Sequence, residues 1–428
     1  MRWLINTFCC LQILMWSVSG FAAEGDAEFS VSPDSGAKVL LPLIQRANKS
    51  IYMNVYMLTN KNIVEELANK ATDGLEIMVI TEGEPTGGMN ASSKKALAEL
   101  YSTFKNSKNA KILIMTSSKH SRNRRYVFDH AKYTVVDGKF VFISSDNFTA
   151  SAFPTGSKAT TSGGSRGWQT LVESPSLARE LTSIFNTDTN LQNPDVVPYE
   201  NTKLNDGDSD NNFFQPQSLV ARKTLFDAQT GTVEGAVLCH SPRSLDCVID
   251  FIRAARSTLD LEHLSMPLNW GDDINPILQE VVAAAKRGVK VRVLLNDEAT
   301  FGDKNNFDGF SESSQKNEDT VKWLLDTAQS KKLPLDAALF DAKAVQVAYV
   351  HNKGMVADRS RTFVSSINGT QNSVENNREV AISLNSRDAG NYFSRVYEFD
   401  WSNRQSDYLL RAPLESMQAI FGMLAHPL

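Results

Sequence analysis

Two stretches of the chain carry the same residue types at the same intervals, and these residues can act on a phosphate ester. In each stretch a Lys lies two residues after a His, an Asp five after the Lys, a Ser eight after the Asp and an Asn two after the Ser. Motif one consists of His130, Lys132, Asp137, Ser145 and Asn147, and motif two of His351, Lys353, Asp358, Ser366 and Asn368. One His can attack phosphorus while the other protonates the leaving alcohol.

The remaining motif residues have expected roles that follow from their chemistry. In a strand, His and Lys two residues apart point to the same face, so each pair covers one surface. The two Lys would neutralise the non-bridging oxygens of the phosphate. The two Asn would orient it as neutral donors, and Ser145 and Ser366 would bind it by further hydrogen bonds. The two Asp are expected to bond backbone near strand ends. We expect no metal or other cofactor, because the Lys pair supplies the charge.

The pattern His-x-Lys-x4-Asp-x6-(Gly/Ser)-Ser-x-Asn, present twice, resembles the phospholipase D superfamily of phosphodiesterases. The resemblance implies a single site built from both motifs and a phosphohistidine intermediate. It covers roughly residues 30–400. Ser144 and Ser365 stand where the family more often has Gly, and a small residue is retained at both places.

The organisation of the chain repeats along with the motifs. Ser32-Pro33 and Ser241-Pro242 each precede a helix-like run and then a strand-like run. Alternating strands and helices, written twice, predict an α/β fold of two repeated sandwich lobes with pseudo-twofold symmetry in a monomeric chain. The expected units are a signal peptide at 1–22, lobe one at 23–187, a linker at 188–217 and lobe two at 218–428.

The resemblance also implies an acidic residue after each motif that accepts the proton of the catalytic His. Motif two is followed by Asn377-Arg378-Glu379-Val380, and we place Gly167-Trp168-Gln169-Thr170 at the matching position after motif one. Glu379 fits the acidic role. Gln169 departs from it, although its amide oxygen can still fix a His tautomer. We also expect Gln169 to contact the substrate. Glu173 is a second candidate.

This asymmetry predicts different roles for the two histidines. A carboxylate neighbour favours the charged form of a His. If Glu379 serves His351, then His351 is the protonated acid. His130, beside Gln169, is then the neutral nucleophile.

The first residues predict export. Arg2 is followed by the largely apolar run 4–18 and by small residues before Ala23, as in a secretory signal peptide. We therefore expect a secreted or periplasmic protein, with an uncleaved N-terminal anchor as the alternative. After cleavage Cys239 and Cys247 remain, and the sequence leaves open whether they form a disulfide or stay as buried thiols.

The substrate is the least determined feature. The net charge is −5, whereas a sequence-neutral nucleic-acid binder is more often basic. We predict a phospholipase D that acts on glycerophospholipid headgroup esters at a membrane surface. A metal-independent nuclease is the alternative, because the basic run 119–125 precedes motif one, with Arg124 and Arg125 as anion-binding residues. The intact His and Lys of both motifs argue against a non-catalytic binding domain. Trp168 and Trp270 are expected in the core, with a place lining the cleft as the alternative.

Overall fold

A computed structural model describes five segments, namely residues 25–116, 124–155, 164–205, 224–301 and 317–405. The predicted signal peptide at 1–22 and residues 119–123 of the basic run lie outside them. The motifs, and the strands that carry them, lie within them.

The first sheet holds motif one. Its strands are β1 (Gly25–Ser32), β2 (Ser50–Val55), β3 (Glu76–Glu82), β4 (Ala110–Met115), β5 (Lys132–Val136), β6 (Phe140–Ser144), β7 (Ser165–Glu173), β8 (Val196–Pro198), β9 (Gln229–Val233) and β16 (Tyr349–Val350). The order is β8-β4-β3-β2-β5-β6-β7-β1-β9, and β16 pairs with β7 off this path. The central strands β2, β3 and β4 are parallel, and β5, β6, β7 and β1 continue the sheet antiparallel.

The second sheet repeats this arrangement around motif two. Its strands are β10 (Gly235–Ser241), β11 (Thr258–His263), β14 (Lys290–Leu295), β15 (Leu335–Leu339), β17 (Lys353–Ala357), β18 (Arg361–Ser365) and β19 (Glu379–Asn385). Read from β15, the order β15-β14-β11-β17-β18-β19-β10 matches β4-β3-β2-β5-β6-β7-β1 in the first sheet. The strands β11, β14 and β15 are again the parallel ones. The prediction of two repeated α/β lobes is confirmed.

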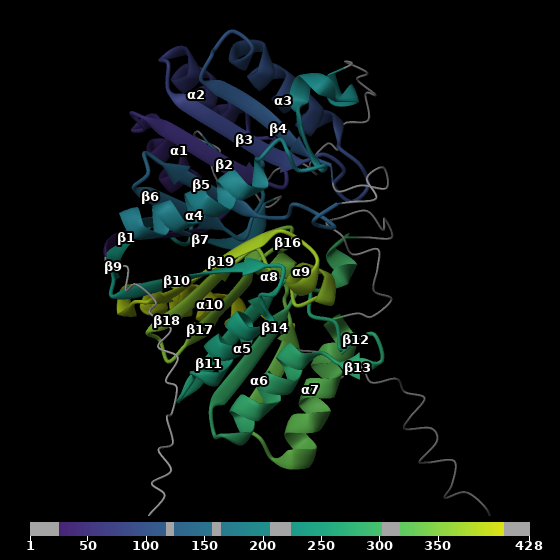
Figure 1. The fold of residues 1–428 in the computed structure, drawn as a ribbon. Helices are drawn as coiled ribbons and strands as arrows, with labels where there is room; N and C mark the ends of the chain where they lie inside the picture. The colour runs from purple at the N-terminus through teal and green to yellow at the C-terminus, as the bar shows by residue number, and fades with distance from the viewer. Residues whose placement is uncertain (1–24, 117–123, 156–163, 206–223, 302–316, 406–428) are drawn as a thin grey trace, which may run out of the picture.

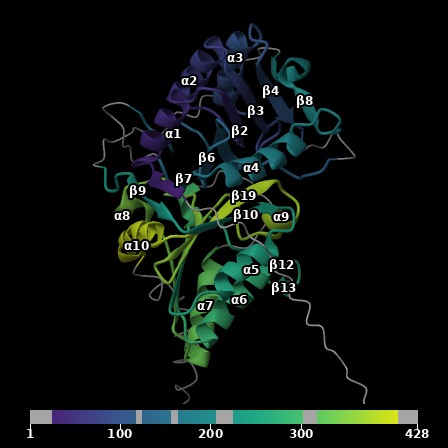
Figure 2. The same cartoon turned by 60° about the vertical axis from the view of Figure 1, so that its left-hand side comes forward.

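Helices form three layers with the two sheets between them (Figure 1). The outer helices are α1 (Gly36–Gln45), α2 (Lys61–Thr72) and α3 (Ala91–Phe104) on lobe one, and α5 (Leu245–Arg253), α6 (Pro276–Lys286) and α7 (Asn317–Lys331) on lobe two. The helices α4 (Pro175–Asp188) and α10 (Arg387–Ser402) lie at the middle level, where the lobes meet (Figure 2). Lobe two also contains the short helices α8 (Ala342–Val345) and α9 (Gln371–Glu375) and the hairpin of β12 (Asn269–Trp270) and β13 (Asp273–Ile274).

The apolar side chains form three cores that follow these layers. One lies under the outer helices of each lobe, and the third joins α4, α10 and the facing strands of both sheets. Trp168 lies in this central core, fully buried and stacked on Phe393 with 4.7 Å between ring centroids. Because one continuous core spans both lobes, the lobes are held in a fixed relation.

The lobe boundaries differ from the prediction on both sides of the linker. Within the predicted linker 188–217, β8 pairs with β4 and extends the first sheet. Within predicted lobe two, β9 pairs with β1 of lobe one. Short strands next to a predicted linker can thus join a neighbouring sheet edge, which composition alone does not reveal. Cys239 and Cys247 form a disulfide, with their Cα atoms 6.2 Å apart, which resolves the alternative left open by the sequence.

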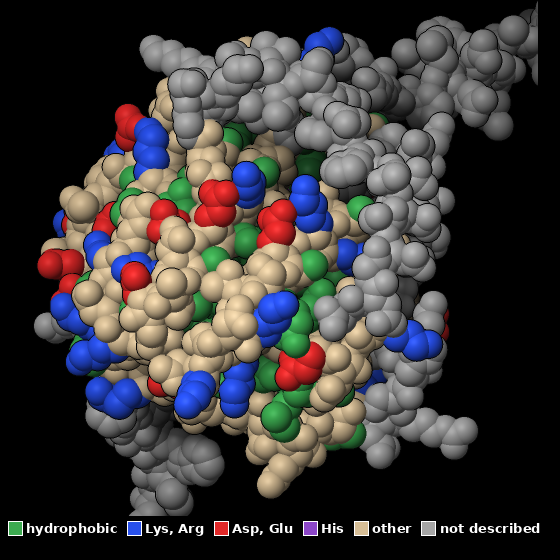
Figure 3. Space-filling view, turned by 90° about the horizontal axis from the view of Figure 1, so that it is seen from above, with side chains coloured by type: hydrophobic (Ala, Val, Ile, Leu, Met, Phe, Trp, Pro, Cys, Tyr) green, Lys and Arg blue, Asp and Glu red, His purple; other side chains and the backbone are tan. Residues whose placement is uncertain are grey.

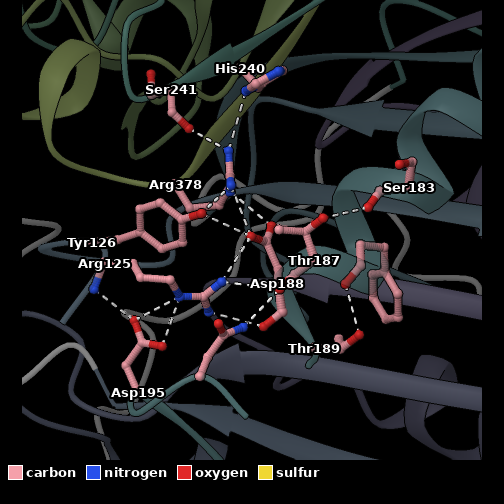
Figure 4. A network of polar contacts seen from close by, with 12 residues as sticks. Arg125, Tyr126, Ser183, Thr187, Asp188, Thr189, Asp195, His240, Ser241 and Arg378 are labelled. Carbon is pink, nitrogen blue, oxygen red and sulfur yellow. Dashed lines mark hydrogen bonds and ion pairs between the residues drawn. The ribbon is translucent and has the colours of Figure 1, made fainter. Parts of the chain in front are cut away.

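Two buried arginines lock the lobes together. On β7, Arg166 lies 2.9 Å from the carboxylates of both Asp34 and Asp400. Just before β19, Arg378 lies 2.8 Å from Asp188 and also bonds the Tyr126 hydroxyl, as Figure 4 shows. Each arginine therefore connects a strand of its own lobe to the inner helix of the other.

Candidate active site

Each motif histidine is held by the backbone of the opposite lobe. The amide of His130 donates to the carbonyl of Arg378, and the amide of His351 donates to the carbonyl of Arg166, both at 2.8 Å. The motif lysines are fully buried, and each ammonium donates to the carbonyl of its own motif His, at 2.6 Å in motif one and 2.7 Å in motif two. The His and Lys of each motif thus meet at the lobe interface.

The imidazole of His130 is oriented by a carboxylate from lobe two. Its Nδ1 lies 2.9 Å and 3.0 Å from the two carboxylate oxygens of Glu379, and its ring packs edge-on against Tyr56 at 4.6 Å. Its Nε2 is buried and has no hydrogen-bond partner among the described residues. Burial lowers the pKa of His130 from 6.5 to about 4, and nearby Lys132 acts in the same direction while Glu379 opposes. Near neutral pH this imidazole is uncharged and presents Nε2 as a lone-pair nitrogen.

The imidazole of His351 faces a carboxylate from lobe one within ion-pair distance. Its Nδ1 lies 3.0 Å from Oδ1 of Asp146, a residue inside motif one. Asp146 also accepts hydrogen bonds from Ser165 at 2.6 Å and from Ser32. Burial acts to raise the pKa of Asp146, but the hydrogen bonds from His351, Ser165 and Ser32 outweigh it and lower the pKa, so the carboxylate stays ionised.

The predicted pairing of Glu379 with His351 is therefore wrong, because Glu379 contacts His130. Gln169 contacts neither histidine, and its amide donates instead to Ser32 at 2.6 Å. Glu173 is partly exposed and pairs with surface Lys139 at 2.7 Å. Sequence reasoning gave Asp146 no role. The strand ends that carry these groups point across the interface, so each histidine finds its partner in the other lobe rather than downstream in its own.

The motif Asn and Ser residues divide into two kinds. Asn147 and Asn368 are buried, and their amide oxygens have no hydrogen-bond partner among the described residues. Their role as donors to a phosphate stays a prediction. The two Ser serve the protein. The hydroxyl of Ser145 accepts from the backbone of β7, and that of Ser366 donates to Glu379 at 2.6 Å. This differs from the predicted phosphate contact, since Ser366 acts by orienting a carboxylate.

The two motif aspartates confirm their structural prediction. Asp137 accepts from three consecutive backbone amides at residues 48–50, and Asp358 does the same at residues 256–258. Both adopt positive φ, 57° and 56°, in the tight turn between the motif strands.

The two arginines that were predicted to bind anions, Arg124 and Arg125, have different surroundings. Arg125 is held by Asp195 at 2.9 Å and by the carbonyls of Thr187 and Asp188 (Figure 4). These contacts fix the last turn of α4, so Arg125 serves the fold rather than the predicted substrate contact. Arg124 is exposed, and its substrate role stays a prediction.

A cavity of about 290 Å³ opens onto His130 and Asn368, one residue from each motif. The other described residues of its lining are uncharged, with the aromatic rings Tyr56, Phe128 and Trp270 beside amide and hydroxyl side chains. Trp270 thus lines the site, which was the alternative to a place in the core, and it also packs against the core of lobe two. Its indole N–H bonds the carbonyl of Gly369 at 3.1 Å. The cavity places a neutral, partly aromatic surface next to the reacting nitrogen.

Metal-binding clusters and membrane-spanning helices are both absent from the described segments. Among these residues no group of three or more His, Cys, Asp or Glu side chains could hold a metal ion. Within the same segments no helix has the length and apolarity to cross a membrane.

Comparison with protein families identifies the class. The family described as cardiolipin synthase, PLD-like domain, matches residues 40–189 and 248–401, one range in each lobe. Since these ranges cover more than half of the chain, the protein belongs to the phospholipase D superfamily. Comparison with curated proteins gave no match.

Solved structures share the fold at low sequence identity. The phosphatidylserine synthase of Haemophilus influenzae Rd KW20 is 14% identical, with a TM-score of 0.61 over 93% of this chain and 92% of that one. The phospholipase D family member Nuc from Salmonella typhimurium is 22% identical, with a TM-score of 0.31 over 40% of this chain and 97% of that one. The polyphosphate kinase of Porphyromonas gingivalis is 11% identical, with a TM-score of 0.48 over 88% of this chain and 50% of that one. The first of these supports the two-lobed architecture.

Proposed function

We propose that the protein is an exported phospholipase D that hydrolyses the headgroup ester of a glycerophospholipid through a phosphohistidine. One observation carries the proposal. Two histidines, each with Nδ1 beside a buried carboxylate, accompany two buried lysines at one interface. A carboxylate on Nδ1 fixes the tautomer that leaves Nε2 available for attack or proton transfer.

The reaction runs in two steps. In the first, Nε2 of His130 attacks phosphorus, the bond to the headgroup oxygen breaks, and that oxygen takes the proton from His351. In the second, His351 removes a proton from a water molecule, the oxygen of that water attacks phosphorus, and the bond between phosphorus and Nε2 of His130 breaks. Lys132 and Lys353 stabilise the charge on the non-bridging oxygens in both steps. His130 suits the nucleophile's role because it is neutral near pH 7.

The cavity favours a lipid headgroup over a nucleic-acid backbone. Among the described residues its lining contains no Lys, Arg, Asp or Glu, whereas grooves that follow a polyanionic backbone are positively charged. On the face of lobe one seen in Figure 3, Lys and Arg side chains are scattered among Asp and Glu. The disulfide supports export, because such bonds persist in oxidising compartments.

The nuclease alternative has its own supporting observation, which is the set of three aromatic rings in the cavity. Aromatic side chains can stack on the bases of single-stranded nucleic acid. We keep it as the second candidate function.

The test uses the mature protein with excess EDTA on vesicles of phosphatidylcholine or phosphatidylglycerol, and on single-stranded DNA. We expect headgroup release that EDTA does not reduce and no DNA cleavage. DNA cleavage without lipid turnover would select the nuclease. Loss of turnover in EDTA that a divalent metal restores would contradict the metal-independent mechanism.

A further inference from the structure

The strand register identifies the true counterpart of Glu379 in lobe one. Where β1 pairs with β7, Ser32 lies opposite Gly167. Where β10 pairs with β19, Ser241 lies opposite Glu379. The Ser-Pro steps that contain these two serines are repeat equivalents, so the place of Glu379 in lobe one belongs to Gly167. Gln169, which lies opposite Ser144, instead corresponds to Ala381, which lies opposite Ser365.

Gly167 leaves a space that the side chain of Asp146 fills. A Cβ atom built on Gly167 would overlap the Asp146 carboxylate and lie 2.7 Å from the Ser145 hydroxyl oxygen. Gly167 does not have the positive φ that would require glycine for backbone reasons. Glycine therefore suits this position because it has no side chain, which leaves room for the Asp146 carboxylate.

The counterpart of Asp146 in lobe two is Ile367. Both residues follow the motif Ser, and the amide of each donates to the hydroxyl two residues before it, at 2.9 Å from Asp146 to Ser144 and 2.7 Å from Ile367 to Ser365. Ile367 is buried in the core of lobe two. Lobe two thus carries an acid on the strand and an apolar residue in the motif, while lobe one carries glycine on the strand and an acid in the motif.

Asp146 is supported as firmly as Glu379. Ser165 and Ser32 donate to its two oxygens, and Gln169 in turn donates to Ser32. Glu379 receives comparable support from Ser366 at 2.6 Å and Asn377 at 3.1 Å. Both carboxylates therefore have fixed orientations toward their histidines.

We propose that Asp146 and Gly167 form a compensating pair, in which Asp146 is the positioning residue for His351 and Gly167 provides the room that its carboxylate needs. The inference rests on the proposed phosphodiesterase chemistry. By accepting the Nδ1 proton of His351, Asp146 keeps the exchangeable proton on Nε2. It also stabilises the imidazolium that protonates the leaving oxygen. Asp146 itself does not touch the substrate.

The test transfers the arrangement of lobe two into lobe one. Asp146→Ile alone removes the carboxylate, and we expect about 10²–10⁴-fold slower hydrolysis of an alkyl headgroup ester, the range of a general acid's contribution. Gly167→Glu alone places a side chain on top of Asp146 and should lower both activity and Tm. The double variant Asp146→Ile/Gly167→Glu should regain at least tenfold over either single variant.

The matched control is Asp146→Ile/Gly167→Gln, which has the same shape without the charge. It should fold like the Glu double variant but stay as slow as Asp146→Ile. Equal activity of the two double variants, or full activity of Asp146→Ile, would overturn the proposal.

A measurement independent of turnover separates this inference from the proposed function. Nitrogen-15 NMR of His351 should show the Nε2-exposed tautomer, with the proton on Nδ1, in the wild type and the Glu double variant. Asp146→Ile and the Gln control should lose that preference. If the wild type cleaves no phosphodiester yet shows this pattern, the proposed function fails while the positioning role stands. An unchanged tautomer in Asp146→Ile would refute the positioning role.

Discussion

The two lobes share strand order, motif spacing and interface contacts, yet they differ in how each supplies a carboxylate to the other. Lobe two supplies Glu379 from the start of a strand, and lobe one supplies Asp146 from within its motif. The His–Lys pairs, the backbone bonds and the paired arginines are the same in both. The comparison teaches that each histidine keeps a carboxylate beside its Nδ1, although the two lobes supply that carboxylate from different positions in their sequences.

The largest expected effect separates the two histidines. His130→Ala should abolish turnover of every phosphodiester, because no covalent intermediate can form. His351→Ala should slow an alkyl ester by about 10²–10⁴-fold but a nitrophenyl ester much less, because nitrophenolate leaves without protonation. Steady-state rates on both substrates test this.

Trapping by a denaturing quench at alkaline pH, where the P–N bond of phosphohistidine survives, and peptide mass spectrometry give the matching readout for the same pair. The phosphoryl group should be found on the peptide that contains His130. A phosphopeptide containing His351 would reverse the two roles and leave the reaction class unchanged.

Glu379→Gln tests whether charge, rather than shape, orients His130. The amide keeps the length of the side chain, but its NH₂ group can face Nδ1 and impose the wrong tautomer. We expect roughly 10²–10⁴-fold loss in kcat, up to the loss seen when an orienting carboxylate becomes an amide in a catalytic triad. Thr170, on β7 and away from the Nδ1 contacts, offers a control in Thr170→Val. A loss in Glu379→Gln no greater than in that control would show that the carboxylate is dispensable.

The buried arginines should differ in their contribution to stability. Arg166→Met leaves two carboxylates, Asp34 and Asp400, without their cation. Arg378→Met leaves Asp188, which keeps the Tyr126 hydroxyl as a donor. We expect a loss of about 3–5 kcal/mol for a broken buried pair, larger for Arg166.

Denaturation midpoints of both variants measure this difference. Arg253→Met is the control, since its side chain is 60% exposed and its pairs lie on the surface. Equal losses of unfolding free energy in all three variants would show that the two buried arginines do not hold the lobes together.

The smallest expected change is in the pH profile. The pKa of His130 is lowered from 6.5 to about 4, and the neutral form attacks. The kcat/KM should therefore stay level as pH falls through 6.5 and decline only as it approaches 4. A pH–rate profile with the fold monitored by circular dichroism tests this, and an acid limb near 6.5 would contradict it.

Much of the site was predictable from residues alone. The spacing of the two motifs identifies the histidines, lysines and asparagines, and the repeat predicts the two lobes. The turn role of Asp137 also follows from its place after a strand. These features are local, since each depends on residues close in sequence.

What the sequence did not reveal depends on contacts across the interface. The partners of His130 and His351 lie in the other half of the chain, and no spacing within one repeat encodes them. The sequence does contain one indication that Gly167, and not Gln169, is the counterpart of Glu379. An Arg precedes both Gly167 and Glu379, and aligning Arg166 with Arg378 places the glycine opposite the acid. The contacts of Arg125 and Trp270 come from segments distant in sequence, namely the end of α4 and Asp195 for Arg125 and Gly369 for Trp270, so local patterns do not indicate them.

Each lobe positions the histidine of the other lobe, and this arrangement affects how such a chain can diverge. A symmetric homodimer of a single lobe would show every substitution twice, so moving the acid would change both histidines at once. Joining the two copies in one polypeptide removes that constraint. One half can then change the origin of its carboxylate while the other keeps the original. Mutational drift can specialise one histidine for attack and the other for proton transfer without passing through a protein in which both are impaired.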